Sequence, residues 1–125
     1  MVDIFISYAR EDQEVVKRLA VALELQGWSV FWDRTIPAGE TWRSHIGKSL
    51  EEARCVVVAW SVDSIESHWV QEEADDARMR NVLIPVLLAP ISPPIGFRSI
   101  TAANLSGWNG NAEDELFLQF RADIS

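Results

Sequence analysis

The chain has 125 residues, 48% of them hydrophobic, and a formal net charge of −8 at pH 7. This length suits one domain with a single core, and the composition excludes a disordered chain. The acidic balance argues against binding to nucleic acid or to an anionic membrane surface.

Targeting and redox signals point to the cytoplasm. A lone cysteine, Cys55, excludes an internal disulfide and fits a reducing compartment. No apolar run reaches membrane-spanning length, and Met1 leads directly into a charged strand, not a signal peptide. We therefore expect residues 1–125 to form one cytoplasmic domain, which could be excised from a longer multidomain protein.

The first half of the chain predicts strand, helix, strand, loop and helix. Residues 2–7 alternate as a strand, and a helix follows with Asp12 as its N-cap and Gly27 at its end. Residues 28–32 form a second strand, and residues 33–41 an irregular loop. The next helix has an inner face made of Trp42, Ile46 and Leu50.

The second half continues the alternation. Residues 55–60 are apolar throughout, as expected of a central parallel strand covered on both faces. A third helix spans residues 68–80, and residues 89–98, with three prolines, hold at most a short helical turn. The remaining elements are a strand at 82–88, a weak strand at 100–105 and a closing helix at 112–124.

This order predicts an α/β fold, a flavodoxin-like, doubly wound sheet of five parallel strands in the order 2-1-3-4-5, with helices on both faces. Ligands of such sheets bind beyond the carboxyl ends of the strands, where the first and third strands diverge. Residues 8–10, 33–42 and 61–73 should therefore surround one crevice.

Trp69 and Glu73 are four residues apart and share one face of the third helix. An aromatic residue beside a single carboxylate suits the cleavage of a glycosidic bond to a cationic leaving group, as in NAD+. The nicotinamide of NAD+ is already a pyridinium and leaves without protonation by an acid, so one carboxylate could stabilise the oxocarbenium-like transition state. Alternatively, Glu73 is solvated among Glu72, Asp75 and Asp76, or Glu72 is the functional carboxylate.

Three aromatic residues and one arginine could bind a dinucleotide. Tyr8, Trp32 and Trp69 could stack on nicotinamide or adenine, or could close the end of the core. Arg10 could pair with the pyrophosphate, or form a surface ion pair with a neighbouring carboxylate.

Other chemistries lack their residues. No glycine-rich phosphate loop follows the first strand, and the two histidines lie on different helices without spaced partners for a metal. Cys55 opens a buried strand, which favours an inert core thiol over a nucleophile. A phosphoacceptor receiver domain would need paired acids after the first strand, where this chain has Ser7 and Tyr8.

Several motifs in one order give the chain a family resemblance. They are Phe-Ile-Ser-Tyr at 5–8, Gly-Trp-Ser-Val-Phe-Trp-Asp at 27–33, Pro-Ala-Gly-Glu at 37–40, Ser-His-Trp-Val-Gln-Glu-Glu at 67–73 and Leu-Ser-Gly-Trp at 105–108. Together they resemble a Toll/interleukin receptor (TIR) domain of bacterial type, and the match spans essentially the whole chain.

The resemblance implies roles for individual residues. Catalytic TIR domains cleave NAD+ with a glutamate four residues after a tryptophan, which falls on Glu73 and Trp69. Tyr8 and Arg10 match positions that contact the dinucleotide, although Ala9 stands where some active relatives carry an arginine. The positions that match the pocket lining are Ser61 and Ser64. The family's BB loop, which mediates assembly, corresponds to Arg34, Thr35, Ile36, Pro37, Ala38, Gly39 and Glu40.

Two classes of function follow from the resemblance. The first is an NAD+ glycohydrolase or cyclase with NAD+ as substrate and no further cofactor, activated by association with other TIR domains in bacterial defence or signalling. The second is a non-catalytic TIR–TIR interaction module, or an effector that interferes with a host's TIR signalling.

Overall fold

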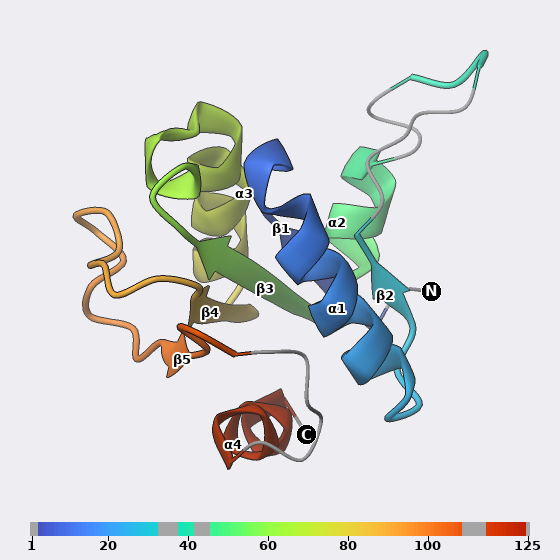
Figure 1. Ribbon diagram of the computed structural model, residues 1–125. Coiled ribbons are helices and arrows are strands. Elements are labelled where there is room, and N and C mark those ends of the chain that lie inside the picture. The colour runs from blue at the N-terminus through green and yellow to red at the C-terminus, as the bar shows by residue number, and fades with distance from the viewer. Residues whose placement is uncertain (1–2, 33–37, 42–45, 109–114, 125) are drawn as a thin grey trace.

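The computed structural model describes residues 3–32, 38–41, 46–108 and 115–124, and it shows a sheet between two layers of helices (Figure 1). Five parallel strands pair in the order β2-β1-β3-β4-β5. They are β1 (Ile4–Ser7), β2 (Val30–Phe31), β3 (Cys55–Trp60), β4 (Leu83–Leu87) and β5 (Ala103–Asn104). The predicted flavodoxin-like sheet and its strand order are confirmed.

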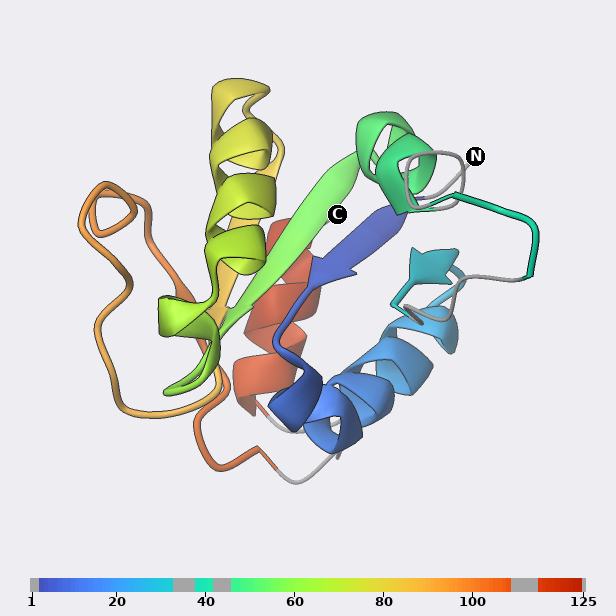
Figure 2. The same ribbon diagram turned by 90° about the horizontal axis from the view of Figure 1, so that it is seen from above.

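The helices cover both faces of this sheet. They are α1 (Gln13–Glu24), α2 (Lys48–Glu52), α3 (His68–Met79) and α4 (Glu115–Ile124), with short 3₁₀ turns η1 (Arg10–Asp12) and η3 (Ser64–Glu66). Figure 2 shows α1 and α4 on one face and α2 and α3 on the other. Within the described ranges, none of the helices is long and apolar enough to cross a membrane.

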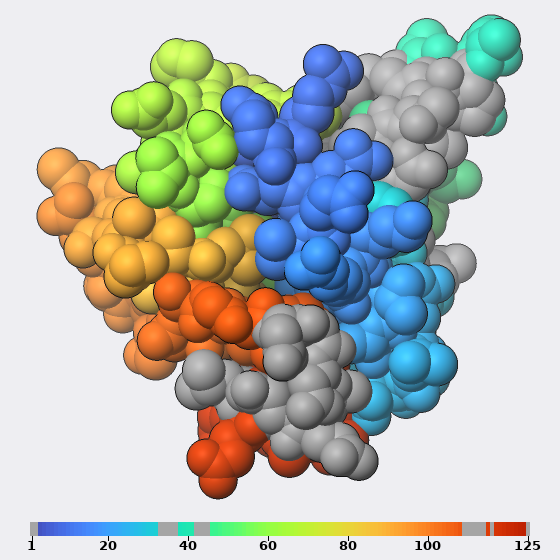
Figure 3. Space-filling view, viewed as in Figure 1, coloured from blue at the N-terminus to red at the C-terminus, as the bar shows by residue number. Residues whose placement is uncertain are grey.

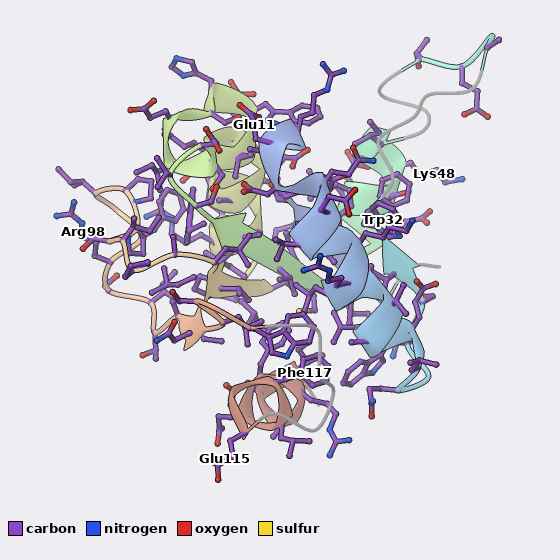
Figure 4. The ribbon with its side chains drawn as sticks, in the orientation of Figure 1. Glu11, Trp32, Lys48, Arg98, Glu115 and Phe117 are labelled. Atoms are coloured by element: carbon purple, nitrogen blue, oxygen red, sulfur yellow. The ribbon has the colours of Figure 1, made fainter. Side chains whose placement is uncertain are left out.

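The core is divided by the sheet into two clusters. All six residues of β3 are buried, as expected of an apolar strand in the middle of a parallel sheet. On β1, Ile4 and Ile6 face α1 and α4, whereas Phe5 faces α2 and α3, because successive side chains of a strand alternate. Phe117, labelled in Figure 4, points from α4 toward the sheet.

The edge strands are shorter than the sequence predicts. Only Val30 and Phe31 of the expected strand 28–32 pair with β1, and Trp28 and Trp32 pack beside the strand, partly buried. At the other edge, β5 has two residues. Hydrophobic pattern alone does not tell how far an edge strand stays paired, because pairing depends on its single neighbour.

Helix ends also differ by small amounts from the prediction. α3 ends at Met79, and Asn81 then adopts a left-handed conformation with φ of 59°, a common way to end a helix. Ile46 and Leu50 are buried as predicted for the inner face of the second helix. Trp42, and residues 112–114 of the closing helix, lie outside the described residues.

Candidate functional site

Glu73 lies on the buried face of α3. The helix begins after Ser67, whose side chain accepts a hydrogen bond from the backbone N–H of Val70. Val70, Ala74 and Ala77 form the apolar stripe against the sheet, and Glu73, three residues after Val70, falls within it. Glu73 is 4% exposed.

Burial distinguishes Glu73 from its neighbour Glu72. Glu72 is exposed, so it is the solvated residue of the pair. The alternative that Glu73 is a solvated helix residue is wrong, because the stripe that packs on the sheet includes its position. A buried carboxylate is costly unless it is hydrogen-bonded, which raises the question of its partners.

Ser7 at the end of β1 is one such partner. Its hydroxyl donates a hydrogen bond to Oε1 of Glu73, with an oxygen–oxygen distance of 2.6 Å, and both side chains are buried. The bond places the carboxylate at the carboxyl end of β1, beside β3, where the fold predicts ligand binding. Ser7 was not among the predicted site residues. Its place two residues after Phe5, on the same face of the strand, is the signal that could have found it.

The three aromatic candidates do not lie together. Trp69, 36% exposed, lies one turn before Glu73 on α3. Tyr8 is 4% exposed and packs in the cluster on the opposite face of the sheet, and Trp32 packs partly buried against that cluster. The arrangement therefore favours the core role for Tyr8 and Trp32, and leaves Trp69 accessible beside the carboxylate.

Arg10 stands exposed at the start of η1, after β1. Among the described residues it forms no ion pair with Glu11 or Asp12.

Ser61 and Ser64 form a compact hydrogen-bonded turn after β3. The backbone N–H of Ser61 donates to Ser64 Oγ at 2.7 Å, and the N–H of Ser64 donates to Ser61 Oγ at 3.1 Å. Ser64 Oγ donates in turn to the carbonyl of Ala59, and the Ser61 hydroxyl donates to the carboxylate of Asp12. The structure thus brings both serines to the predicted edge, with their hydroxyls bonded within the protein.

Asp12 occupies the predicted N-cap position of α1 but makes no capping hydrogen bond with its side chain. Its carboxylate accepts a hydrogen bond from the Ser61 hydroxyl. Burial raises the pKa of Asp12 above its ordinary value, the bond from Ser61 lowers it, and the nearby Asp63 and Glu11 raise it further.

The predicted BB loop is only partly described. Ala38, Gly39 and Glu40 are exposed, and Gly39 has a φ of 91° that glycine adopts readily. Arg34, Thr35, Ile36 and Pro37 lie outside the described residues. In the part of the chain that the structure describes, no cluster of three or more His, Cys, Asp or Glu side chains could hold a metal ion.

Comparison with known proteins identifies the family. The family model described as TIR domain matches residues 4–119. The chain belongs to the TIR domain family. In its fold, this TIR domain is similar to the crystal structure of the TIR domain of the Toll-related receptor TRR-2 from Hydra magnipapillata. The TM-score is 0.81 at 23% identity, covering 99% of this chain and 98% of that one.

Two curated bacterial relatives carry names that describe an activity. A 2′ cyclic ADP-D-ribose synthase of Acinetobacter baumannii, AbTIR, is 30% identical over 118 residues. That similarity covers 93% of this chain and 42% of the relative. An NAD(+) hydrolase of Paracoccus denitrificans, PdTIR, is 28% identical over 98% of this chain and 44% of its own length. The TIR domain thus spans less than half the length of either relative.

Proposed function

We propose that this TIR domain cleaves the bond between nicotinamide and ribose in NAD+, with Glu73 as the catalytic carboxylate. The observation that carries the proposal is the buried, hydrogen-bonded Glu73 side chain at the carboxyl ends of β1 and β3. The names of the bacterial relatives, one a cyclase and one a hydrolase, support the same substrate.

The chemistry requires one well-placed negative charge. The bond between ribose C1′ and the pyridinium nitrogen breaks with its electron pair going to nitrogen, which releases neutral nicotinamide and leaves an oxocarbenium-like ribose. The Glu73 carboxylate would stabilise this positive charge and accept hydrogen bonds from the ribose hydroxyls. The bond from Ser7 would fix the orientation of the carboxylate before substrate arrives.

The nucleophile that captures the ribose then decides the product. Attack by water, with loss of a proton, gives ADP-ribose, whereas attack by a hydroxyl group of the same molecule gives a cyclic ADP-ribose. Trp69 would stack on a ring of the dinucleotide, and Arg10 would pair with the pyrophosphate. Ser61 and Ser64 would shape the surroundings of the substrate, and Tyr8 and Trp32 would support them from the core side.

Association with other TIR domains is the second part of the proposal. Val21 and Leu25, one turn apart at the end of α1, are 48% and 77% exposed, which favours a contact surface there. Residues 34–40 would add the BB loop contact. A purely adaptor role would use the same surfaces without NAD+ cleavage, and the experiment below distinguishes the two.

The test is NAD+ consumption with product analysis, on protein at high concentration and protein clustered on a support. We expect wild type to release nicotinamide and Glu73→Gln, which keeps the shape and an acceptor for Ser7, to lose ~100-fold or more of the rate. Glu72→Gln is the matched control, since it removes the same charge from the next, exposed position.

Two results would overturn the proposal. If a folded Glu73→Gln protein kept its rate, Glu73 would not be the catalytic group. If clustered wild type released no nicotinamide while remaining folded, the interaction-module function would replace the enzyme. Glu73→Ala is a weaker probe, because it leaves the Ser7 hydroxyl without the acceptor that Glu73 supplies.

A further inference from the structure

A second polar contact crosses the same end of the sheet. Asp12, at the end of η1, accepts a hydrogen bond from the hydroxyl of Ser61, which follows β3. The two residues are 49 positions apart. Figure 3 shows the segment after β1 in contact with the segment after β3 on this face of the molecule. The contact joins the segment that leads from β1 to α1, on one face of the sheet, to the segment that leads from β3 to α3, on the other face.

The Ser61 side of this contact is a stiff turn. The Ser61 hydroxyl donates to Asp12 and accepts from the N–H of Ser64, so its donor and an acceptor site are both used inside the protein. The carbonyl of Ser61 accepts from the N–H of Ile65 at 3.1 Å. Two residues after Ile65, Ser67 caps α3. The turn therefore leads directly to the first turn of α3, which carries Trp69.

Asp12 lies where η1 runs directly into α1, with φ of −97° and ψ of 10°, so its backbone lacks the extended conformation that is typical of a capping residue. An aspartate at an N-cap position normally accepts from a backbone N–H in the first turn of its own helix, which contributes ~1 kcal/mol. Asp12 makes no such bond with its side chain. Its carboxylate is held near Glu11, labelled in Figure 4, and near Asp63, both of which repel it. A purely local role for Asp12 does not account for this arrangement.

We propose that Asp12 is a positioning residue, which through Ser61 holds the turn at residues 61–67, and with it Trp69, in place for the dinucleotide. This inference rests on the proposed NAD+ cleavage and deepens it. Glu73 has its own support in Ser7, on a different strand. The Asp12–Ser61 pair therefore governs how well substrate is held, and the Ser7–Glu73 pair governs the chemical step.

Kinetics of four variants test this division. Asp12→Ala should raise KM for NAD+ about five-fold while kcat changes less than about two-fold. Asp12→Asn, which retains an acceptor for Ser61, should stay close to wild type. Ser61→Ala should resemble Asp12→Ala, and the double variant should be no worse than the poorer single one, because both remove one interaction. A KM unchanged in Asp12→Ala, an Asp12→Asn as impaired as Asp12→Ala, or additive effects in the double variant would overturn the inference.

A measurement without turnover separates this inference from the proposed function. Hydrogen exchange should speed up at the backbone amides of residues 61–67 in Asp12→Ala, but not in Asp12→Asn, while β4 exchanges as in wild type. Unchanged exchange at 61–67 would show that the pair holds nothing, whatever the activity. If wild type cleaves no NAD+ and Asp12→Ala still exchanges faster at residues 61–67, the proposed function is refuted, whereas the role of Asp12 in holding this turn is retained.

Discussion

Ser7 and Glu73, 66 positions apart in the chain, are joined by a 2.6 Å hydrogen bond between two buried side chains. The bond links the end of β1 to the middle of α3, so an inner strand of the sheet fixes the carboxylate of a helix that covers it. A carboxylate held in this way is oriented before any ligand binds, which is the arrangement that electrostatic stabilisation of a transition state requires.

Removal of the Ser7 hydroxyl is the first prediction. Ser7→Ala should lower kcat for NAD+ cleavage about ten-fold with little change in KM, because the carboxylate loses its orientation but the substrate surface stays. It should also lower the free energy of unfolding by about 1–3 kcal/mol, since a buried carboxyl group loses a hydrogen-bond donor. Ser99→Ala, at an exposed position, is the control for the substitution itself. Equal kcat in wild type and Ser7→Ala would contradict the orienting role.

The pH dependence of stability is the second prediction, and it concerns Asp12. Burial, with repulsion from Asp63 and Glu11, raises the pKa of Asp12 above its ordinary value of 3.8 despite the bond from Ser61. The Asp12 carboxyl group therefore binds its proton more tightly in the native state than in the unfolded chain. As the pH rises from 3.8 through the native pKa of Asp12, ionisation of this group lowers the free energy of unfolding.

Asp12→Asn should remove that cost. The free energy of unfolding of Asp12→Asn, minus that of wild type, should be larger at neutral pH than at acid pH. Urea denaturation at both pH values measures this difference. Glu14→Gln, an exposed change on α1, controls for the loss of one negative charge. A difference between Asp12→Asn and wild type that shrinks as the pH rises would show that the charged form of Asp12 is favoured in the native state.

The sheet order was predictable because it rests on long-range alternation of apolar strands and amphipathic helices. β3 is apolar at all six positions and α3 has a clear apolar stripe, so the hydrophobic pattern of the sequence is enough to place both elements in the fold. The extents of β2 and β5 were not predictable, since a short edge strand depends on pairing with one neighbour and not on its own pattern.

The geometry of the candidate site was predictable in part. Periodicity places Glu73 three residues after Val70 on the buried face of α3. Residue type does not separate it from the three acidic residues near it in the sequence. The partners Ser7 and Asp12 come from distant segments, and no local pattern states that a serine at a strand end meets a helix carboxylate. Local propensity likewise favoured a side-chain cap by Asp12, but η1 runs directly into α1 at this residue and its carboxylate bonds to Ser61.

Arg80 carries the third prediction, on the stability of the layer that contains Glu73. Its guanidinium donates to the carbonyls of Leu50 and Glu51 at the end of α2, at 2.7 and 2.9 Å, and to Asp76. Arg80→Ala should lower the free energy of unfolding by about 1–2 kcal/mol, because the last carbonyls of α2 lose their donors. Urea denaturation measures the change.

Two variants make the Arg80 experiment specific. Arg80→Lys keeps the charge but lacks the planar fork that reaches two carbonyls at once, so it should recover less than half of the loss. Lys48→Ala removes an exposed ion pair with Glu52 and should change stability by less than about 0.5 kcal/mol. Full recovery by lysine would mean that charge, not the paired hydrogen bonds, is what Arg80 contributes.

The fourth prediction concerns Cys55, whose thiol is buried at the start of β3. Burial raises the pKa of this thiol from 9.0 to about 12, which lowers the reactive thiolate fraction about a thousandfold near neutral pH. A thiol reagent such as Ellman's reagent should therefore react at least ~100-fold more slowly with native protein than with urea-unfolded protein. Cys55→Ala should keep NAD+ cleavage, because the thiol packs in the core and belongs to no step of the reaction. Rapid modification of the native protein, or loss of cleavage in a folded Cys55→Ala variant, would instead identify an accessible nucleophile.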